Sequence, residues 1–196
     1  MSVLGNLVAS HKPLIYMDES TFLSQDRKAR SWLRMYEKPT ELAFDNERFV
    51  VTVYGAIGSC LTEPVYMTAK STNKVDFVKF LRLVKAKQRS PYTKPVLFYD
   101  QASAHTSGIG QTFLKEHFMP MRNVAHSCCF NAIEKVWQVA KCYFRKRLLL
   151  HPEALTMASF KQLVLWALAD VSESAIRGIL RSNTWYIRHM LTQKLN

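Results

Sequence analysis

The sequence predicts an α/β domain with a mixed sheet, and three observations lead to that class. Short β-branched and aromatic runs fill the first half of the chain, a continuous apolar run lies near its centre, and helical spacing of apolar residues dominates from residue 131 onward. This order of elements is typical of a mixed sheet covered by helices. With 196 residues, 48% of them hydrophobic, we expect one globular domain over residues 1–196.

Three strands are expected in the first half of the chain. Leu14–Met17 is a short apolar run that ends directly before Asp18, and Arg48–Ile57 is rich in β-branched and aromatic residues. Pro64–Ala69 follows after a short linker, which predicts that these last two strands are antiparallel neighbours.

A helix is predicted over Asn73–Lys87, where apolar residues recur at helical spacing. Ser71, Thr72 or Asn73 is suited to cap its start. Its other side is basic, which is compatible with an ordinary solvated face or with DNA contact. The basic residues of that side are Lys74, Lys79, Arg82, Lys85 and Lys87.

The second half of the chain begins with one buried strand and continues mainly with helices. Pro95–Tyr99 is a continuous apolar run that ends directly before Asp100, as expected of a central strand. The remaining elements are predicted in this order: a helix over Ser107–His117, a short strand over Arg122–Ala125, and helices over Asn131–Leu149, Thr156–Val171 and Glu173–Leu195.

The charge of the chain favours a polyanionic partner. It has 27 Lys and Arg against 15 Asp and Glu, a formal net charge of +12, and such a surface suits nucleic acid, or less often an acidic membrane. No apolar run approaches the roughly 18 residues that span a bilayer, and the N-terminus lacks the pattern of a secretory signal. We therefore expect an intracellular protein without a membrane partner.

The four cysteines indicate neither a disulfide framework nor a structural zinc site. Cys60, Cys128, Cys129 and Cys142 form no C-x-x-C pair, and His126 beside two of them fits no standard zinc spacing. We interpret them as reduced thiols.

Three acids follow or begin predicted elements in a way that points to a metal site. Asp18 and Asp100 come directly after apolar strands, and the ends of such strands are where α/β sheets usually bind ligands. Glu134 begins a helix whose apolar residues, such as Val136 and Trp137, are spaced to face the core. Taken alone, Glu134 is better explained as an ordinary Glu in the first turn of a helix, where the helix dipole favours it.

The segments around these acids resemble a known family. They are Tyr16–Phe22 (YMDESTF), Phe98–Ser107 (FYDQASAHTS) and Ser127–Trp137 (SCCFNAIEKVW), and Ser31–Arg34 (SWLR) is similar to a Trp-containing strand that follows the first of them. In this order and spacing they resemble the three catalytic-acid segments of mariner-type DDE cut-and-paste DNA transposases and their bacterial insertion-sequence relatives. The resemblance covers residues 12–150.

The resemblance implies a ribonuclease H-like fold, a five-stranded mixed sheet flanked by helices. It implies that Asp18, Asp100 and Glu134 are the catalytic residues and hold two Mg²⁺ or Mn²⁺ ions. Asp18 and Asp100 are then the principal ligands, with Asp100 shared by both ions. Glu19 is disfavoured as a direct ligand, because adjacent residues on a strand point in opposite directions.

The resemblance further implies the chemistry and the partners. Water cuts the transposon ends, and the freed 3′-hydroxyl attacks target DNA, typically at a TA dinucleotide. Candidate DNA-binding residues are His105, Lys135, Lys141 and Arg145, although His105 is equally suited to a structural role. The residues before the first strand are too few for the helix-turn-helix region of the family, so we expect either a fragment or a separate subunit that supplies DNA recognition. The resemblance also implies a homo-oligomer. The protein would act in the nucleus of a eukaryote or the cytoplasm of a bacterium.

The chain departs from the family pattern at four positions. Gln101 replaces the usual Asn, and Cys128, Cys129 and Ala132 replace Pro, Asp and Pro. The lost prolines predict a looser or reshaped turn before Glu134 and leave open a domesticated, weak or inactive transposase that serves as a DNA-binding or assembly module. A ribonuclease H or Holliday-junction resolvase is disfavoured by the segment Asn131–Trp137. A basic α/β protein of unrelated function is the remaining alternative.

Overall fold

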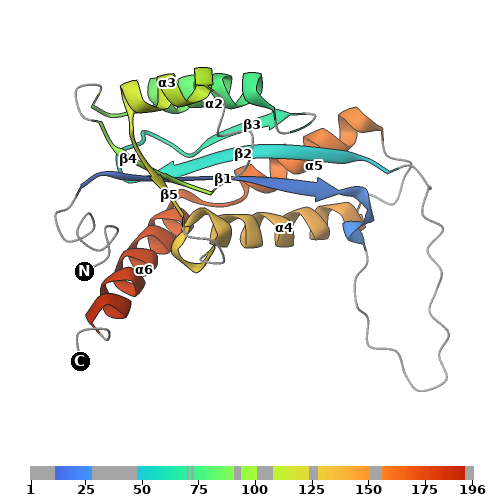
Figure 1. Ribbon diagram of the computed structural model, residues 1–196. Coiled ribbons are helices and arrows are strands. Elements are labelled where there is room, and N and C mark those ends of the chain that lie inside the picture. The colour runs from blue at the N-terminus through green and yellow to red at the C-terminus, as the bar shows by residue number, and fades with distance from the viewer. Residues whose placement is uncertain are drawn as a thin grey trace.

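A five-stranded mixed sheet with helices on both faces forms the centre of the molecule (Figure 1). The structure is a computed structural model that describes residues 12–27, 48–69, 71, 73–90, 94–100, 108–123, 128–150 and 156–192. Two features predicted from the sequence, the Ser31–Arg34 strand and His105, lie outside these residues. None of the helices in the described ranges is long and apolar enough to cross a membrane.

The sheet has the strand order β3-β2-β1-β4-β5. Its strands are β1 (Leu14–Leu23), β2 (Val50–Gly58), β3 (Val65–Ala69), β4 (Val96–Tyr99) and β5 (Met119–Arg122). β2 runs antiparallel to β3, as the short linker between them predicted, and also to β1, whereas β4 runs parallel to β1 and to β5. The predicted mixed five-stranded sheet is confirmed.

The helices form two layers, one on each face of the sheet (Figure 1). Helices α2 (Lys74–Ala86) and α3 (Gly108–His117) lie on one face. Helix α4 (Ile133–Leu150) lies on the opposite face together with α5 (Met157–Ala169) and α6 (Glu173–Thr192). Short 3₁₀ helices follow β1 at Ser24–Arg27 and precede α4 at Cys128–Phe130.

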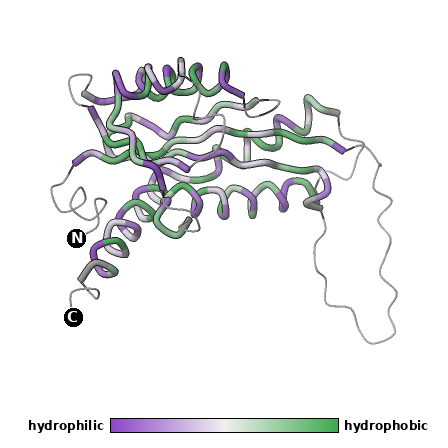
Figure 2. Tube along the Cα trace, in the orientation of Figure 1, coloured by the Kyte–Doolittle hydropathy of each residue, from purple (hydrophilic) through white to green (hydrophobic). Residues whose placement is uncertain are grey.

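Alternation along the strands divides the apolar residues between two cores. On β1, Ile15 and Met17 pack with α2 and α3, whereas Tyr16 and Phe22 pack with α4, α5 and α6. Figure 2 shows the apolar residues concentrated along the strands and on the inner sides of the helices. Asp18 therefore belongs to the α4 side of β1, and Glu19 belongs to the α2 side.

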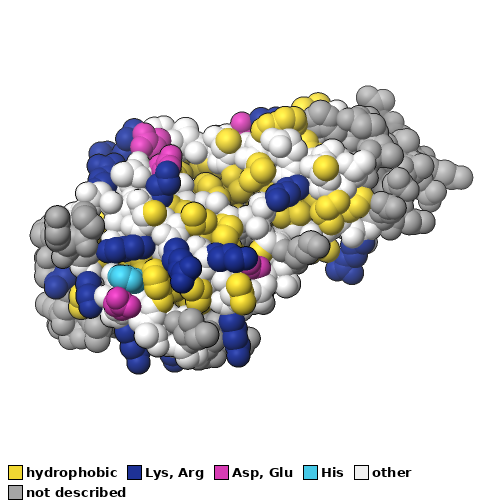
Figure 3. Space-filling view, turned by 90° about the horizontal axis from the view of Figure 1, so that it is seen from above, with side chains coloured by type: hydrophobic (Ala, Val, Ile, Leu, Met, Phe, Trp, Pro, Cys, Tyr) yellow, Lys and Arg dark blue, Asp and Glu magenta, His cyan; other side chains and the backbone are white. Residues whose placement is uncertain are grey.

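The helix starts follow their capping residues. Asn73, one of the three predicted caps, accepts a hydrogen bond at 2.8 Å from the backbone N–H of Asp76 and so begins α2. Thr156 and Ser159 exchange hydrogen bonds in a capping box at the start of α5. The outer face of α2 and α3 carries Lys and Arg side chains among apolar and acidic ones (Figure 3).

The strand boundaries differ from prediction in two places. β1 continues to Leu23 instead of ending at Met17, because its pairing with β2 runs on through Leu23↔Val50 and Phe22 is buried. Asp18 consequently lies inside the strand and not at its end. The last strand is Met119–Arg122 instead of Arg122–Ala125. This strand was not predicted because Pro120 argues against a strand, but a strand at the edge of a sheet tolerates proline.

Candidate metal centre

Parallel pairing of β1 with β4 brings Asp18 and Asp100 together from distant parts of the sequence. Tyr16 pairs with Phe98 across this ladder, so the residues two positions further on, Asp18 and Asp100, lie at matching heights on neighbouring strands. Asp100 directly follows the last residue of β4, as predicted. The prediction that these two acids meet at one place on the sheet therefore agrees with the geometry.

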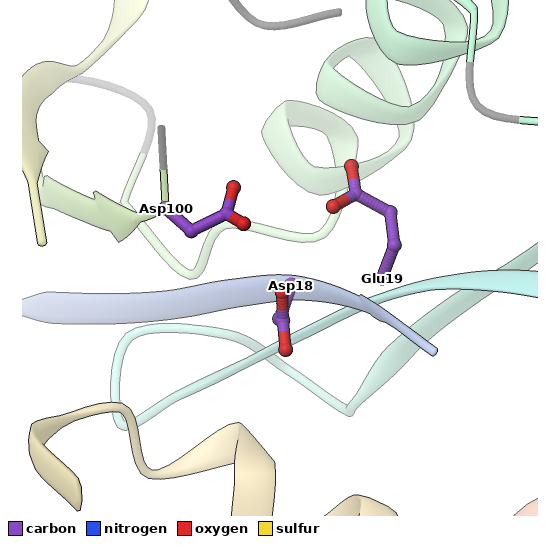
Figure 4. A group of neighbouring side chains, drawn as sticks. All are labelled: Asp18, Glu19 and Asp100. Atoms are coloured by element: carbon purple, nitrogen blue, oxygen red, sulfur yellow. The ribbon is translucent and has the colours of Figure 1, made fainter. Parts of the chain in front are cut away.

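Glu19 belongs to the same group of carboxylates. The carboxylate oxygens of Asp18, Glu19 and Asp100 lie within 4.8 Å of one another. Figure 4 shows the Asp18 side chain on one side of β1 and the Glu19 side chain on the other, with Asp100 projecting toward Glu19. Asp18 and Glu19 point in opposite directions as expected, yet Glu19 belongs to the acidic group because Asp100 projects toward it. Its lower rank as a metal ligand stays a prediction, one that was made from β1 alone and without the position of Asp100 on β4.

Glu134 lies on the α4 side of β1, opposite to the side that carries Glu19. It lies partly buried in the first turn of α4, on the face of the sheet toward which Asp18 points. Glu134 contributes the largest effect of any neighbouring carboxylate on the pKa of Asp18. The three acids that the motifs singled out thus lie around one place, although Glu134 is outside the tight group formed with Glu19.

The electrostatics of Asp18 are those of a site built for a cation. Its side chain is buried, with 9% exposed. Burial, followed by the negative charge of Glu134 and then those of Glu19 and Asp100, raises the pKa of Asp18 to about 7, while a hydrogen bond from the backbone of Glu19 opposes the shift. Several carboxylates held together at this depth repel one another, and a divalent cation relieves that repulsion.

Gly55 allows α4 to lie close to the candidate metal centre, by which we mean Asp18, Glu19, Asp100 and Glu134. It lies directly opposite Asp18 on β2. A β-carbon at Gly55 would lie 2.6 Å from Cζ2 of Trp137, still closer to its Cη2, and 2.9 Å from Cδ1 of Ile133. The indole of Trp137 therefore occupies the space of the missing side chain, and the first turn of α4, which carries Glu134, sits close to the sheet. The pattern of apolar residues predicted that Trp137 faces the core but not what it packs against.

Two asparagines fix the backbone that leads into α4. Nδ2 of Asn131 donates a hydrogen bond at 3.2 Å to the carbonyl of Met17, the residue before Asp18. Nδ2 of Asn183, on α6, donates to the carbonyl of Phe130 at 3.0 Å. The turn that has lost its prolines is thus an anchored 3₁₀ turn over Cys128–Phe130. Asn131 was part of a recognised motif, whereas the role of Asn183 had no signal in the sequence beyond an Asn among apolar helix residues.

The predicted DNA-binding residues of α4 differ in exposure. Lys135 and Lys141 are half-buried, and the Lys141 ammonium lies 5.8 Å from the centre of the Phe22 ring. Arg145, one turn further along, is exposed. Their contact with DNA stays a prediction.

Comparisons with known proteins agree with this arrangement. A family model described as DDE superfamily endonuclease matches residues 13–156. The Mos1 mariner paired end complex with Mn is similar over 93% of this chain and 57% of its own, with a TM-score of 0.67 and 11% identity. The catalytic domain of Mos1 mariner transposase is similar over 94% of this chain and 88% of its own, with a TM-score of 0.58 and 10% identity.

A viral relative shares the fold more distantly. The simian T-cell lymphotropic virus intasome in complex with PP2A regulatory subunit B56 gamma is similar over 82% of this chain and 48% of its own, with a TM-score of 0.53 and 12% identity. The chain thus spans about half the length of the intasome and paired-end chains that it matches. These likenesses confirm the predicted ribonuclease H-like fold. A comparison with curated proteins found no match.

Proposed function

Because the chain belongs to the DDE superfamily of endonucleases, as its motifs predicted, we propose that it is the catalytic domain of a mariner-type DNA transposase. In this proposal it cuts DNA at transposon ends and joins those ends to target DNA. The observation that carries the proposal is the meeting of Asp18 and Asp100 on neighbouring parallel strands, with Glu134 of α4 on the side toward which Asp18 points.

The side chains of the centre fit divalent cations. Carboxylate oxygens are the ligands that Mg²⁺ and Mn²⁺ prefer, and those of Asp18, Glu19 and Asp100 lie within 4.8 Å of one another. The Mos1 catalytic domain has been solved with Mn and with Mg, which supports the same choice of metals here. We propose two ions, which Asp18 and Asp100 would hold as principal ligands.

The chain's own residues then have separable tasks. Divalent ions bound here would supply activation of the attacking oxygen and stabilisation of the leaving one. Asp18 and Asp100 would hold those ions through the β1–β4 ladder. Glu134 would act as a further ligand and would orient the attacking water from the α4 side. Glu19 is a second candidate for this third position, because its carboxylate belongs to the group that contains Asp100.

An inactive DNA-binding or assembly module is the less favoured alternative. Asp18, Asp100 and Glu134 are all present and lie around one place. DNA binding alone does not require such a cluster of acids, so the cluster favours a catalytic role. The turn before α4, whose altered residues suggested decay, is held by hydrogen bonds from Asn131 and Asn183.

The test is metal-dependent DNA cleavage by the purified chain. With Mg²⁺ or Mn²⁺ we expect nicking of a DNA duplex, reduced by at least about a hundredfold in Asp18→Ala and in Asp100→Ala because each substitution removes a principal metal ligand. Asp170→Asn is the matched control, since Asp170 pairs with Arg147 at 2.8 Å on the α4–α5 side and touches none of the acids of the centre.

Comparison of Glu134→Gln with Glu19→Gln identifies the third ligand. The substitution at the residue that binds metal should weaken both cleavage and Mn²⁺ binding, whereas the other substitution should leave Mn²⁺ binding unchanged. Cleavage by Asp18→Ala and Asp100→Ala at the wild-type rate would remove the catalytic assignment. A wild-type chain that binds Mn²⁺ and DNA but leaves the duplex intact would favour the inactive module.

A further inference from the structure

A groove runs between α6 and the end of the sheet where β1 begins and β2 ends. It consists of two adjoining hollows of about 350 Å³ and about 610 Å³ that share Ser59, Leu180 and Arg181 in their walls. The sheet side is formed by residues 12–14, Tyr16 and the segment from 57 to 64. We call this feature the α6 groove.

One complete face of α6 lines the groove. The lining residues recur every three or four positions, which is the spacing of one side of a helix. They are Glu173, Ile176, Arg177, Leu180, Arg181, Thr184, Trp185 and Arg188. Figure 1 shows that the C-terminal end of α6 projects away from the sheet. The groove therefore follows the helix outward from the body of the molecule.

The lining of the groove is basic. Its five basic residues are Lys12, Arg89, Arg177, Arg181 and Arg188, against two acids, Glu63 and Glu173. Glu173 is paired with Arg177 at 3.2 Å, and Glu63 is paired with Lys87. Nε of Arg89 donates to the carbonyl of Leu61 at 2.9 Å, which holds its guanidinium at the wall. A concave surface of this charge attracts phosphate groups.

An exposed aromatic ring lies at the outer end of the groove. The Trp185 side chain is 65% exposed although its ring stacks on His189, with centroids 5.0 Å apart and an interplanar angle of 7°. An exposed indole beside arginines is the arrangement that nucleic-acid-binding proteins use to stack an unpaired base. The outer face of α2 is also basic (Figure 3), but there Lys79 pairs with Asp76, and acidic side chains are interspersed.

The groove leads toward the metal centre along β1. Tyr16 lines the groove and precedes Asp18 by two residues, so both lie on the same side of the strand, roughly 7 Å apart along it. Nδ2 of Asn183, also on α6, donates a hydrogen bond at 3.0 Å to the carbonyl of Phe130, in the turn before α4. The wall of the groove is thus continuous with the backbone that positions Asp18 and Glu134.

We propose that the α6 groove holds the DNA strand that leads away from the phosphate to be cut. Arg181 and Arg188 bind successive backbone phosphates, and a base unpaired near the cut stacks on Trp185. This inference rests on the proposed function for the identity of the reaction, but the binding itself needs neither metal nor cleavage.

The experiment measures binding of a short fluorescein-labelled single-stranded DNA to the full chain by anisotropy in EDTA over a range of salt concentrations. We expect Arg181→Ala and Arg188→Ala each to weaken binding and to reduce the slope of log affinity against log salt by about 0.7. Trp185→Ala should weaken binding about tenfold with an unchanged salt slope, and Trp185→Phe should restore most of it. Arg82→Ala, an exposed arginine on α2, is the matched control and should bind like wild type.

Repeating the series in an Asp18→Ala background separates this proposal from the proposed function. The groove variants should lose the same affinity there, whether or not the wild-type chain cleaves DNA. Wild-type affinity and salt slope in Arg181→Ala and Trp185→Ala would overturn the proposal, as would an equal loss in Arg82→Ala. If the chain bound single-stranded RNA of the same sequence more tightly than the DNA, the proposal that DNA occupies the groove would be overturned.

Discussion

Gly55 and Asp18 face each other across the β1–β2 ladder, and the absence of a side chain at Gly55 sets how closely α4 lies to the sheet. Protein cores are close-packed, so one methyl group forced between Gly55 and Trp137 displaces the helix or the ring. Glu134 lies one turn before Trp137 on the same helix. A substitution at Gly55 therefore changes the position of Glu134 relative to Asp18, although none of the acids is substituted.

We expect Gly55→Ala to destabilise the fold by about 1–3 kcal/mol through overpacking and to lower the cleavage rate. Adding Trp137→Phe should recover part of both, because a phenyl ring lacks the Cζ2 and Cη2 atoms that the new methyl would strike. Gly178→Ala is the control, since a β-carbon there meets nothing within 4 Å. Thermal unfolding and cleavage are measured together, and a Gly55→Ala chain as stable and active as wild type would contradict the expectation.

At the scale of single residues, sequence reasoning succeeded where an acid came with a recognisable neighbourhood. Asp18, Asp100 and Glu134 each stand in a segment that resembles a known motif, and the structure places all three around one point. Glu19 and Gly55 were missed for one reason. Their importance depends on which residues lie opposite them on β4 and β2, and strand register cannot be read from local sequence.

The start of α4 is the element whose geometry matters most to the metal centre. Asn131 ties it to β1 through the carbonyl of Met17, and Asn183 of α6 ties the preceding turn to the same layer of helices. Both side chains are buried. The segment directly before α4 is therefore held by hydrogen bonds to β1 and α6, in addition to the helical hydrogen bonds of α4 itself.

We expect Asn131→Ala to destabilise the chain by about 1–3 kcal/mol, because it removes a buried hydrogen bond, and also to weaken Mn²⁺ binding. Thr156→Ala removes the capping box of α5 at a comparable cost of about 1 kcal/mol and should leave Mn²⁺ affinity unchanged. Calorimetric titration with Mn²⁺, beside chemical denaturation, distinguishes the two effects. Equal losses of Mn²⁺ affinity in both variants would show that general stability, and not the position of α4, controls the centre.

At the scale of elements, periodicity located the helices well and the strand limits less well. Helices α2 and α5 begin directly after a capping residue that can be read from the sequence, Asn73 and Thr156 respectively. β1 was cut short because its second half, with Ser20 and Thr21, is less apolar than its first, yet pairing with β2 continues through it. β5 was displaced because Met-Pro-Met-Arg carries no β-branched residue.

The stability of the whole molecule should depend on the pH through Asp18. Its pKa is raised to about 7 in the folded chain, from 3.8. In metal-free protein the fold therefore favours the protonated acid, and this contribution to the free energy of unfolding is fully present below about pH 4 and lost as the pH rises through about 7. Each unit between the two pKa values corresponds to about 1.4 kcal/mol, so the contribution is at most about 4 kcal/mol.

Denaturant unfolding in EDTA between about pH 5 and pH 8 measures this effect. We expect the free energy of unfolding of wild type to fall relative to that of Asp18→Asn over this range, because the amide cannot ionise. Added Mn²⁺ should remove most of the difference at the upper end. Parallel pH curves for the two chains would mean that Asp18 ionises as easily in the folded state as in the unfolded one.

For the molecule as a whole, composition and the order of elements sufficed for the class of fold. The net charge of +12 indicated a polyanionic partner, but it did not indicate where that partner lies. The α6 groove draws its basic residues from Lys12, Arg89 and the last helix. Only the folded chain brings these segments together, so no local pattern marks the groove.

The order of strands in the sheet also has a consequence for biosynthesis. β1 and β4 lie side by side, but β2, β3 and α2 are made between them, and α4 is made after both. Contacts between such distant segments form late and slowly during folding. A growing chain therefore carries no complete set of acids until α4 has emerged and docked. In the proposed function, the centre that cuts DNA strands is therefore complete only after α4 has been synthesised and has docked on the sheet.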